Sequence, residues 1–285
     1  MDGSAVAPAA GTVLNALATG HGSAFAIDEY VHADVRLDAG EGGVTGHVED
    51  APDADTRLIE RCVELAAADT TADSVTGIVE TASEVPMASG LKSSSAAANA
   101  TVLATLDALG VAEETSREAA ARIGVRAARD VGVTVTGAFD DASASMLGGL
   151  TVTDNERDAL LTRDEVDWDV LVWTPPTQSF SADADADRCA QIAPVADLVR
   201  ELALAGRYET AMTVNGFAFC AALDHPAGPA VDALPAADGV SLSGTGPSYV
   251  AVGDREALDD VNDIWSTYEG DTWLTTTQTQ GARTN

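Results

Sequence analysis

A turn rich in glycine and serine runs without a break into an alanine-rich helix, and this junction constrains the fold more than any other feature. Residues 86–96 read PMASGLKSSSA, and helix-forming residues continue to Leu109. The first turn of a helix has free N–H groups and the positive end of the helix dipole, which together favour a phosphate group. We therefore expect a phosphate-binding loop here, with Lys92 adding positive charge. A serine-rich cap on a buried helix is the alternative.

The same segment does not match the P-loop, which requires the pattern GxxxxGK[ST]. Leu91 separates Gly90 from Lys92, and Val85 stands where the first glycine of that pattern would be. Phosphate binding by this segment would therefore use a different loop geometry.

The chain of 285 residues has 46 acidic and 15 basic residues, so its net charge is −31. This balance excludes a basic nucleic-acid-binding face. Apolar residues make up 46% of the chain, which indicates a globular protein and not a disordered one. Dense carboxylates indicate adaptation to molar salt, where the Debye length is about 3 Å. We expect a halophilic protein, and in such a chain the single lysine, Lys92, stands out.

Location and cysteine chemistry are also constrained by the sequence. No apolar run approaches the roughly 20 residues that a transmembrane helix needs. The first basic residue is Arg36, so the basic region of a secretory signal is missing and we expect a cytoplasmic protein. Cys62, Cys189 and Cys220 are far apart, which argues against a disulfide framework or a cysteine-based zinc site. The sequence gives no indication of the oligomeric state.

Apolar patterning predicts the secondary structure. Expected strands are residues 5–7, 12–18, 23–37, 74–83, 131–136, 150–153, 169–174, 239–243, 248–253 and 272–277. Expected helices are residues 56–69, 96–109, 115–130, 188–205, 207–223 and 255–268, with a capping box from Thr115 to Glu118. Residues 41–55 and the acidic stretch 183–187 are expected to be loops, and residues 155–167 to cross between two domains. The second half has the order of an α+β sandwich.

Three further motifs could bear chemistry. Asp140 and Asp141 follow an expected strand and precede Gly148-Gly149, so they could supply a base or a Mg²⁺ ligand, or only cap a turn. Residues 243–248 (SGTGPS) form a glycine-rich turn between two apolar strands, where a plain hairpin turn is the alternative. Residues 9–12 (AAGT) precede His21, which lies between two glycines and could bind a substrate or fill a turn.

In their order and spacing these motifs resemble the GHMP kinases, the superfamily that includes galactokinase, homoserine kinase, mevalonate kinase and phosphomevalonate kinase. Residues 86–96 look like the PxxxGLxSS phosphate loop of that family, and residues 243–248 look like its C-terminal glycine-rich motif. Asp141, seven residues before Gly148, matches the catalytic aspartate of several members. Many members have Lys or Arg where this chain has Thr12, so the Asp–Lys pair of mevalonate kinase is missing in that form.

Within the superfamily, residues 11–20, 90–99 and 136–142 resemble the archaeal shikimate kinases. The resemblance implies ATP-dependent phosphorylation of the 3-hydroxyl of shikimate. It also implies an α+β fold of two domains: residues 1–155 form an N-terminal α/β domain with a left-handed βαβ element, and residues 156–285 form a C-terminal ferredoxin-like domain. The site should lie in the cleft between them. Homoserine kinase is the alternative of the same class, and a non-catalytic nucleotide-binding sensor is the alternative of another class.

The resemblance also implies roles for particular residues. Asp141 would be the base, with Asp140 as the second candidate, and Ser93 or Ser94 would reach Mg²⁺. The carboxylate of shikimate needs a cation or backbone donors, and Arg36, Arg126 and Arg129 are the arginines nearest in sequence to these motifs. The expected ATP-binding residues are Pro86, Met87, Ala88, Ser89, Gly90, Leu91, Lys92, Ser93, Ser94, Ser95 and Ala96. The expected substrate-binding residues are Thr12, Asn15, His21, Ser243, Gly244, Thr245 and Gly246.

Overall fold

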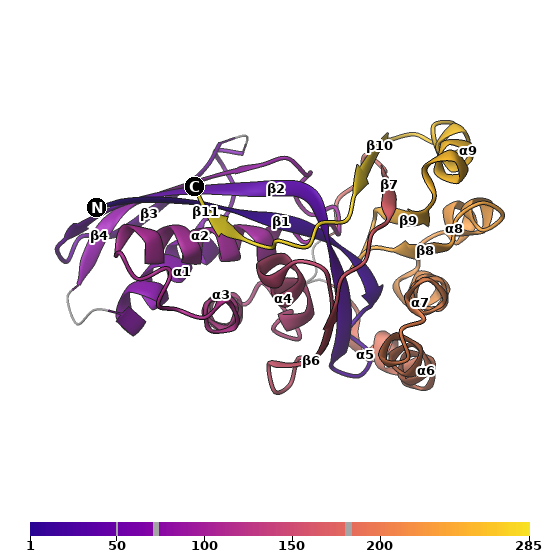
Figure 1. Ribbon diagram of the computed structural model, residues 1–285, viewed down its shortest axis with the longest axis horizontal. Coiled ribbons are helices and arrows are strands. Elements are labelled where there is room, and N and C mark those ends of the chain that lie inside the picture. The colour runs from indigo at the N-terminus through magenta and orange to yellow at the C-terminus, as the bar shows by residue number, and fades with distance from the viewer. Residues whose placement is uncertain (50, 71–73, 180–183) are drawn as a thin grey trace.

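A computed structural model describes residues 1–49, 51–70, 74–179 and 184–285 (Figure 1). The first half contains β1 (Asp2–Leu14), β2 (His21–Ala39), β3 (Gly43–Val48), α1 (Arg57–Thr70), β4 (Val75–Ser83), α2 (Ser93–Ala108), α3 (Arg117–Val131), α4 (Phe139–Leu147), β5 (Leu150–Asp154) and β6 (Ala159–Asp164). The second half contains β7 (Asp169–Thr174), α5 (Ala186–Ala190), α6 (Ala193–Leu204), α7 (Tyr208–Leu223), α8 (Gly228–Ala233), β8 (Gly239–Leu242), β9 (Tyr249–Gly253), α9 (Arg255–Trp265), β10 (Asp271–Thr276) and β11 (Arg283–Thr284).

The first sheet has seven strands, in the order β11-β1-β2-β4-β3, with β5 on β2 and β6 on β5. Helices α1 to α4 lie on one of its faces (Figure 1). The parallel pair β3 and β4 is joined through α1, which makes a βαβ element. The left-handed sense of this crossover stays a prediction. Helix α2 is buried on nearly every side, which suits its alanine-rich composition, because a helix without a polar face must lie inside.

The second sheet has four strands in the order β10-β7-β9-β8. In chain order these are the fourth, first, third and second strands, all pairs are antiparallel, and helices connect them as in a βαββαβ unit. This arrangement confirms the expected ferredoxin-like fold of the second half. Helices α6 to α9 cover the outer face of this sheet (Figure 1).

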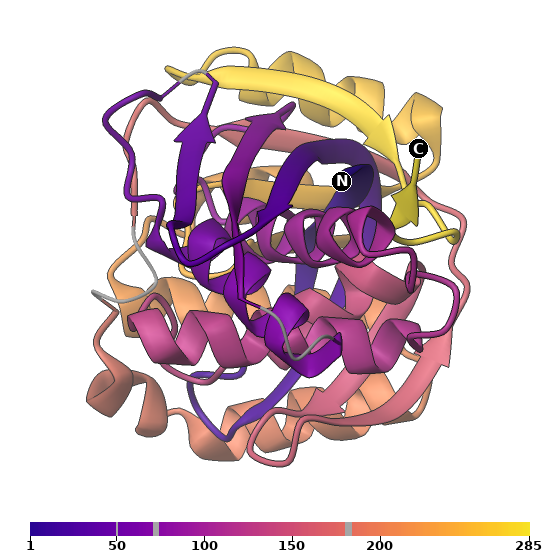
Figure 2. The same ribbon diagram turned by 90° about the vertical axis from the view of Figure 1, so that its left-hand side faces the viewer.

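Strands β1 and β2 connect the two halves. The N-terminal part of β1 pairs with β11, and the C-terminal part of β2 pairs with β4. Beyond an irregularity at Pro8, the other parts of both strands extend towards the second sheet. There Val13 and Phe25 share one apolar core with Val170 of β7 and Val199 of α6. Viewed from the left-hand end of Figure 1, the N-terminal strand and the C-terminal segment lie close together (Figure 2). The division at residue 155 stays a proposal; it falls between the paired strands β5 and β6.

Several expected elements differ from the structure. Residues 131–136 form no strand: α3 runs to Val131, Gly132 ends it at a φ of 75°, and a loop follows. Residues 41–55 contain β3, and residues 155–167 contain β6. The helix expected over residues 188–205 is divided into α5 and α6. Ser116, and not Thr115, caps α3 by accepting a hydrogen bond from the Ala119 N–H.

Smaller differences complete the comparison. Residues 5–7 and 12–14 belong to the single strand β1, and residues 15–18, also expected in a strand, form a turn. Helix α2 already begins at Ser93. Of the acidic stretch 183–187, residue 183 lies outside the described residues, and Asp185 caps α5. None of the helices in the described ranges is long and apolar enough to cross a membrane.

Candidate active site

The loop before α2 presents an uncapped helix N-terminus. Lys92, the residue that precedes α2, has a φ of 65°, and no side chain caps the helix. The first helical hydrogen bond runs from the Ala96 N–H to the Lys92 carbonyl at 3.0 Å, so the N–H groups of the preceding turn are left for a ligand or water. Helix α3, by contrast, is capped by Ser116. This supports the phosphate-loop prediction, and Ser93 is half-buried there while Ser94 is exposed.

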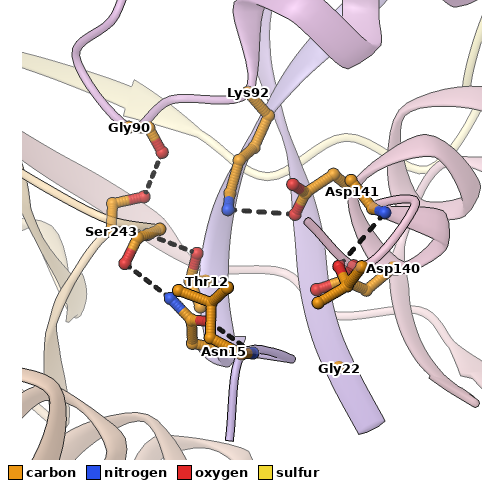
Figure 3. A network of polar contacts seen from close by, with 12 residues as sticks. Thr12, Asn15, Gly22, Gly90, Lys92, Asp140, Asp141 and Ser243 are labelled. Atoms are coloured by element: carbon orange, nitrogen blue, oxygen red, sulfur yellow. Dashed lines mark hydrogen bonds and ion pairs between the residues drawn. The ribbon is translucent and has the colours of Figure 1, made fainter. Parts of the chain in front are cut away.

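The glycine-rich turn packs directly on this loop. The Ser243 hydroxyl donates to the Gly90 carbonyl at 2.9 Å (Figure 3). The Ser248 N–H donates to the Ser89 carbonyl at 3.1 Å. A Cβ atom at Gly90 would lie 2.2 Å from the Ser243 carbonyl oxygen, and the φ of Gly90 is +90°. Only glycine therefore lets the two segments meet. Residues 153 positions apart in the sequence thus form one wall of the site.

The end of β1 holds the glycine-rich turn from the other side. The Thr12 hydroxyl accepts a hydrogen bond from the Gly244 N–H at 2.8 Å, and the Asn15 amide donates to the Gly244 carbonyl at 2.8 Å. Asn15 is itself fixed because its N–H donates to the side-chain oxygen of Asn215 at 2.9 Å. Thr12 therefore supports the turn through its hydroxyl.

Lys92 and Asp141 form an ion pair at the centre of the site. The Lys92 Nζ lies 3.0 Å from the Asp141 Oδ1, and these side chains are only 10% and 14% exposed. Lys92 is the last residue of the loop before α2, and Asp141 lies in the first turn of α4 (Figure 3). Sequence reasoning missed this contact, although the uniqueness of Lys92 was a signal for it. The chain thus has an Asp–Lys pair whose lysine comes from the loop before α2 and not from position 12.

Asp140 is buried behind this pair and is 4% exposed. Its Oδ1 accepts a hydrogen bond from the Asn155 amide at 2.7 Å. A Cβ atom at Gly22 would lie 2.3 Å from the Asp140 Oδ2, so a side chain at position 22 would displace this carboxyl group. Burial, together with the charge of Asp141, raises the pKa of Asp140 to about 7, while Lys92 and the Asn155 hydrogen bond oppose the rise.

Two cavities open beside the glycine-rich turn, and Thr245 lines both. One of about 50 Å³ is lined by Asn15, Ala16, Leu17, Lys92, Thr134, Val135, Thr136, Ala138, Asp140, Asp141, Gly244 and Thr245. The other, of about 260 Å³, is lined by Ser179, Ala184, Asp185, Arg188, Ala222, Leu223, Asp224, His225 and Thr245. The loop of residues 134–138, of which 134–136 were expected in a strand, therefore lines the smaller cavity.

The structure brings most of the expected site residues together, and His21 is set apart from them. The half-buried His21 ring lies 3.3 Å from the Thr19 carbonyl, and among the described residues it lines neither cavity. Arg126 pairs with Asp69 and Arg129 with Asp158, so both arginines have carboxylate partners already. Arg188, which sequence reasoning did not select, lines the larger cavity.

Comparison with known proteins shows the family of the chain. Residues 57–149 match the family model described as the GHMP kinases N-terminal domain. The shikimate kinase of Halobacterium salinarum is 63% identical to this chain over 284 residues, with 100% of both chains covered. The chain belongs to the archaeal shikimate kinases of the GHMP type. The shikimate kinase of Methanosarcina mazei is 49% identical over 93% of this chain and 90% of its own.

Solved structures show that the shikimate kinase chain has the GHMP fold. The homoserine kinase of Cytophaga hutchinsonii has a TM-score of 0.77 at 17% identity, with 100% of this chain and 97% of that chain covered. The mevalonate kinase of Methanococcus jannaschii has a TM-score of 0.76 at 12% identity, with 97% and 98% covered. At such low identity these likenesses concern the fold alone, and the predicted GHMP kinase fold is confirmed.

Proposed function

We propose that this kinase transfers the γ-phosphate of ATP to the 3-hydroxyl of shikimate, giving shikimate 3-phosphate and ADP. The observation that carries the proposal is the 3.0 Å contact between Lys92 of the phosphate loop and Asp141 of α4. It joins a candidate phosphate-binding segment to a candidate base beside a cavity. The names of relatives up to 63% identical over their full length support shikimate as the substrate.

The nucleotide would bind along residues 86–96. The uncapped first turn of α2 offers N–H donors and the positive end of the helix dipole to the β- and γ-phosphates. Lys92 adds a cation that lies at the junction between this loop and α4. Phosphoryl transfer depends mainly on positioning and on neutralising charge, and this loop can contribute to both.

Mg²⁺ fits the residues around the loop. Among the described residues no group of three or more His, Cys, Asp or Glu side chains is arranged to hold a metal. Mg²⁺ in kinases needs few protein ligands, because it keeps several waters and binds substrate phosphates. The Ser93 or Ser94 hydroxyl would supply the protein ligand. When bound, the ion would neutralise charge on the transferred phosphoryl group.

In the transfer step, the substrate 3-hydroxyl would attack the γ-phosphorus while its proton passes to the Asp141 carboxylate. The bond from the γ-phosphorus to the β,γ-bridging oxygen breaks, and ADP keeps that electron pair. Lys92 would hold Asp141 in place and lie near the phosphates. Asp140 serves less well as the base, because it is buried and its Oδ1 already accepts a hydrogen bond from the Asn155 amide.

The substrate would lie beside Asn15, Gly244 and Thr245 in the smaller cavity, with its carboxylate towards the larger one. Among the described residues, Arg188 in the larger cavity is the one arginine that lines these two cavities. We therefore assign it to the substrate carboxylate. Arg188→Met should raise the KM for shikimate at least tenfold while leaving the KM for ATP within twofold, since a charge-assisted hydrogen bond contributes about 1.5–3 kcal/mol. A KM for shikimate that is the same in Arg188→Met and the wild type would refute the assignment.

The decisive experiment measures ADP formation with shikimate, homoserine and mevalonate side by side in molar KCl. Turnover with shikimate alone would support the proposal, and turnover with homoserine would favour the alternative kinase. ATP binding without turnover of any alcohol would favour a nucleotide-binding sensor. Cytoplasmic location, a halophilic habit and the lack of a nucleic-acid partner stay predictions within this proposal.

A further inference from the structure

Asn155 lies between β5 and β6, in a stretch that the sequence suggests is only a polar crossing. Its side chain is 0% exposed. A buried amide is costly unless its donors and acceptors are paired, so each of its contacts is informative.

Both ends of the Asn155 side-chain amide form hydrogen bonds with Asp140 of α4. Its Oδ1 accepts hydrogen bonds from the Asp140 N–H at 3.1 Å and from the Thr153 hydroxyl at 2.7 Å. Its Nδ2 donates to the Asp140 Oδ1 at 2.7 Å and to the Thr136 hydroxyl at 3.4 Å. Asp140 is therefore held at its backbone and at its carboxyl by one residue.

The backbone of Asn155 fixes the same residue to two more segments. Its N–H donates to the Gly20 carbonyl at 2.8 Å, at the turn between β1 and β2. Its carbonyl accepts from the Arg129 guanidinium of α3 at 3.0 Å, and Arg129 also pairs with Asp158. Asn155 thus connects α3, the β1–β2 turn, the 134–138 loop and the start of α4.

We propose that Asn155 is a positioning residue for phosphoryl transfer: by holding Asp140 at two points, it fixes the first turn of α4 and sets the Asp141 carboxylate against Lys92. This role rests on the function proposed above. Asp141 follows Asp140 directly in the helix, so a rotation of this turn would move the Asp141 carboxylate away from the Lys92 ammonium. In this role Asn155 acts through its two hydrogen bonds with Asp140 and does not need to touch a substrate.

The same contacts bear on charge. The charged groups that act on the Asp140 carboxyl are Asp141 on its own helix and Lys92 at the start of α2. The Asn155 amide stabilises the charged form of Asp140, so its removal should raise the pKa of Asp140 above about 7. A charged hydrogen bond corresponds to a shift of about one pH unit or more. An ionised Asp140–Asp141 pair accepts a proton more readily than a pair that already shares one.

The test compares three variants with the wild type. Asn155→Leu removes the amide contacts with Asp140. Thr153→Val removes the hydroxyl that donates to the Asn155 Oδ1 at 2.7 Å and to the Gly22 carbonyl at 3.4 Å. Asn99→Leu is the matched control, because Asn99 is also 0% exposed and holds α4 by donating to the Ala142 carbonyl at 2.9 Å, away from Asp140. For each, kcat, KM and the Kd for ATP are measured from pH 5.5 to 9, along with thermal melting.

We expect Asn155→Leu to lower kcat about 10²-fold, the usual cost of a misplaced reacting group, while the Kd for ATP changes less than threefold. The acid limb of its kcat profile should move up by about one unit. Thr153→Val should show the same changes in weaker form. Asn99→Leu should lower the melting temperature with no shift of the limb. The proposal would be overturned if the acid limb of the kcat profile moved by the same amount in Asn155→Leu and Asn99→Leu. It would also be overturned if the acid limb moved in neither variant.

A readout without turnover separates this proposal from the proposed function. Carbon-13 NMR follows the carboxyl titration of Asp140 directly, with Asp140→Asn identifying the signal. If the wild type phosphorylates none of the three alcohols, the proposed function fails, yet an upward shift of this titration in Asn155→Leu still supports the link from Asn155 to Asp140. If the wild type phosphorylates shikimate and neither kcat nor the titration changes in folded Asn155→Leu, only the positioning role fails.

Discussion

Two neighbouring carboxyl groups in one helical turn have different surroundings. Asp141 is partly exposed beside Lys92, whereas Asp140 is enclosed by Asn155 and the backbone at Gly22. Burial raises the pKa of Asp140, whereas Asp141 forms an ion pair with Lys92. The difference follows from position in the fold, because the two residue types are identical.

Asp141→Asn tests the assignment of the base. The amide cannot accept a proton from the substrate, yet it has nearly the same shape and can still contact Lys92. We expect kcat to fall roughly 10²–10⁴-fold, the range for a positioned base, with the Kd for ATP almost unchanged. Calorimetric titration and steady-state rates measure the two quantities. Near-normal turnover in a folded variant would point to Asp140 instead.

Asp140→Asn should stabilise the folded protein at high pH. The pKa of Asp140 is raised from 3.8 to about 7, so between these values the folded state holds a proton that the unfolded state has released. The stability of the wild type due to this group therefore falls as the pH rises through that window. We expect the variant to melt a few degrees above the wild type at pH 8 and close to it at pH 4.5. A gap that does not grow with pH would contradict the raised pKa.

At the scale of elements, the phosphate loop and the glycine-rich turn act as one unit, and this unit could be predicted only in part. The serine run at the start of α2 was readable because helix N-termini have a sequence signature. The Lys92–Asp141 contact was not, since it joins two elements through tertiary packing. Residues 131–136 are rich in valine and threonine, which suggested a strand. Gly132 ends α3 there instead, and tertiary structure outweighs β-propensity.

Gly90→Ala tests that unit. A Cβ atom would lie 2.2 Å from the Ser243 carbonyl oxygen, so the loop must move away from the turn. We expect the KM for ATP to rise at least tenfold, with a loss of about 1–2 kcal/mol from the left-handed backbone. Gly110→Ala is the control, because Gly110 has a φ of +74° and nothing within 4 Å of the added atom. Both variants should lose stability, and an equal KM for ATP in the two would refute the coupling.

At the scale of the whole molecule, the chain has 46 acidic and 15 basic residues. When screening is weak, repulsion among the excess carboxylates opposes folding. The Debye length is about 30 Å at 0.01 M ionic strength and about 3 Å at 1 M. We expect the melting temperature and the initial rate at fixed Mg-ATP to rise together from tens of millimolar to molar KCl. A matched series in sucrose separates screening from general exclusion of solutes. A flat or falling response to KCl would refute the halophilic interpretation.

The pairing of β11 with β1 affects the order in which the first sheet is assembled during synthesis. Strand β11 pairs with β1 in the first sheet, and the Asn285 N–H donates to the Ser4 carbonyl at 3.0 Å. On the ribosome, β1 is synthesised first and its partner β11 is synthesised after the residues of the second sheet. The edge of β1 that β11 covers therefore stays open until the second sheet has been synthesised, and an open strand edge can pair with other chains. The pairing of β11 with β1 thus follows the synthesis of the second sheet.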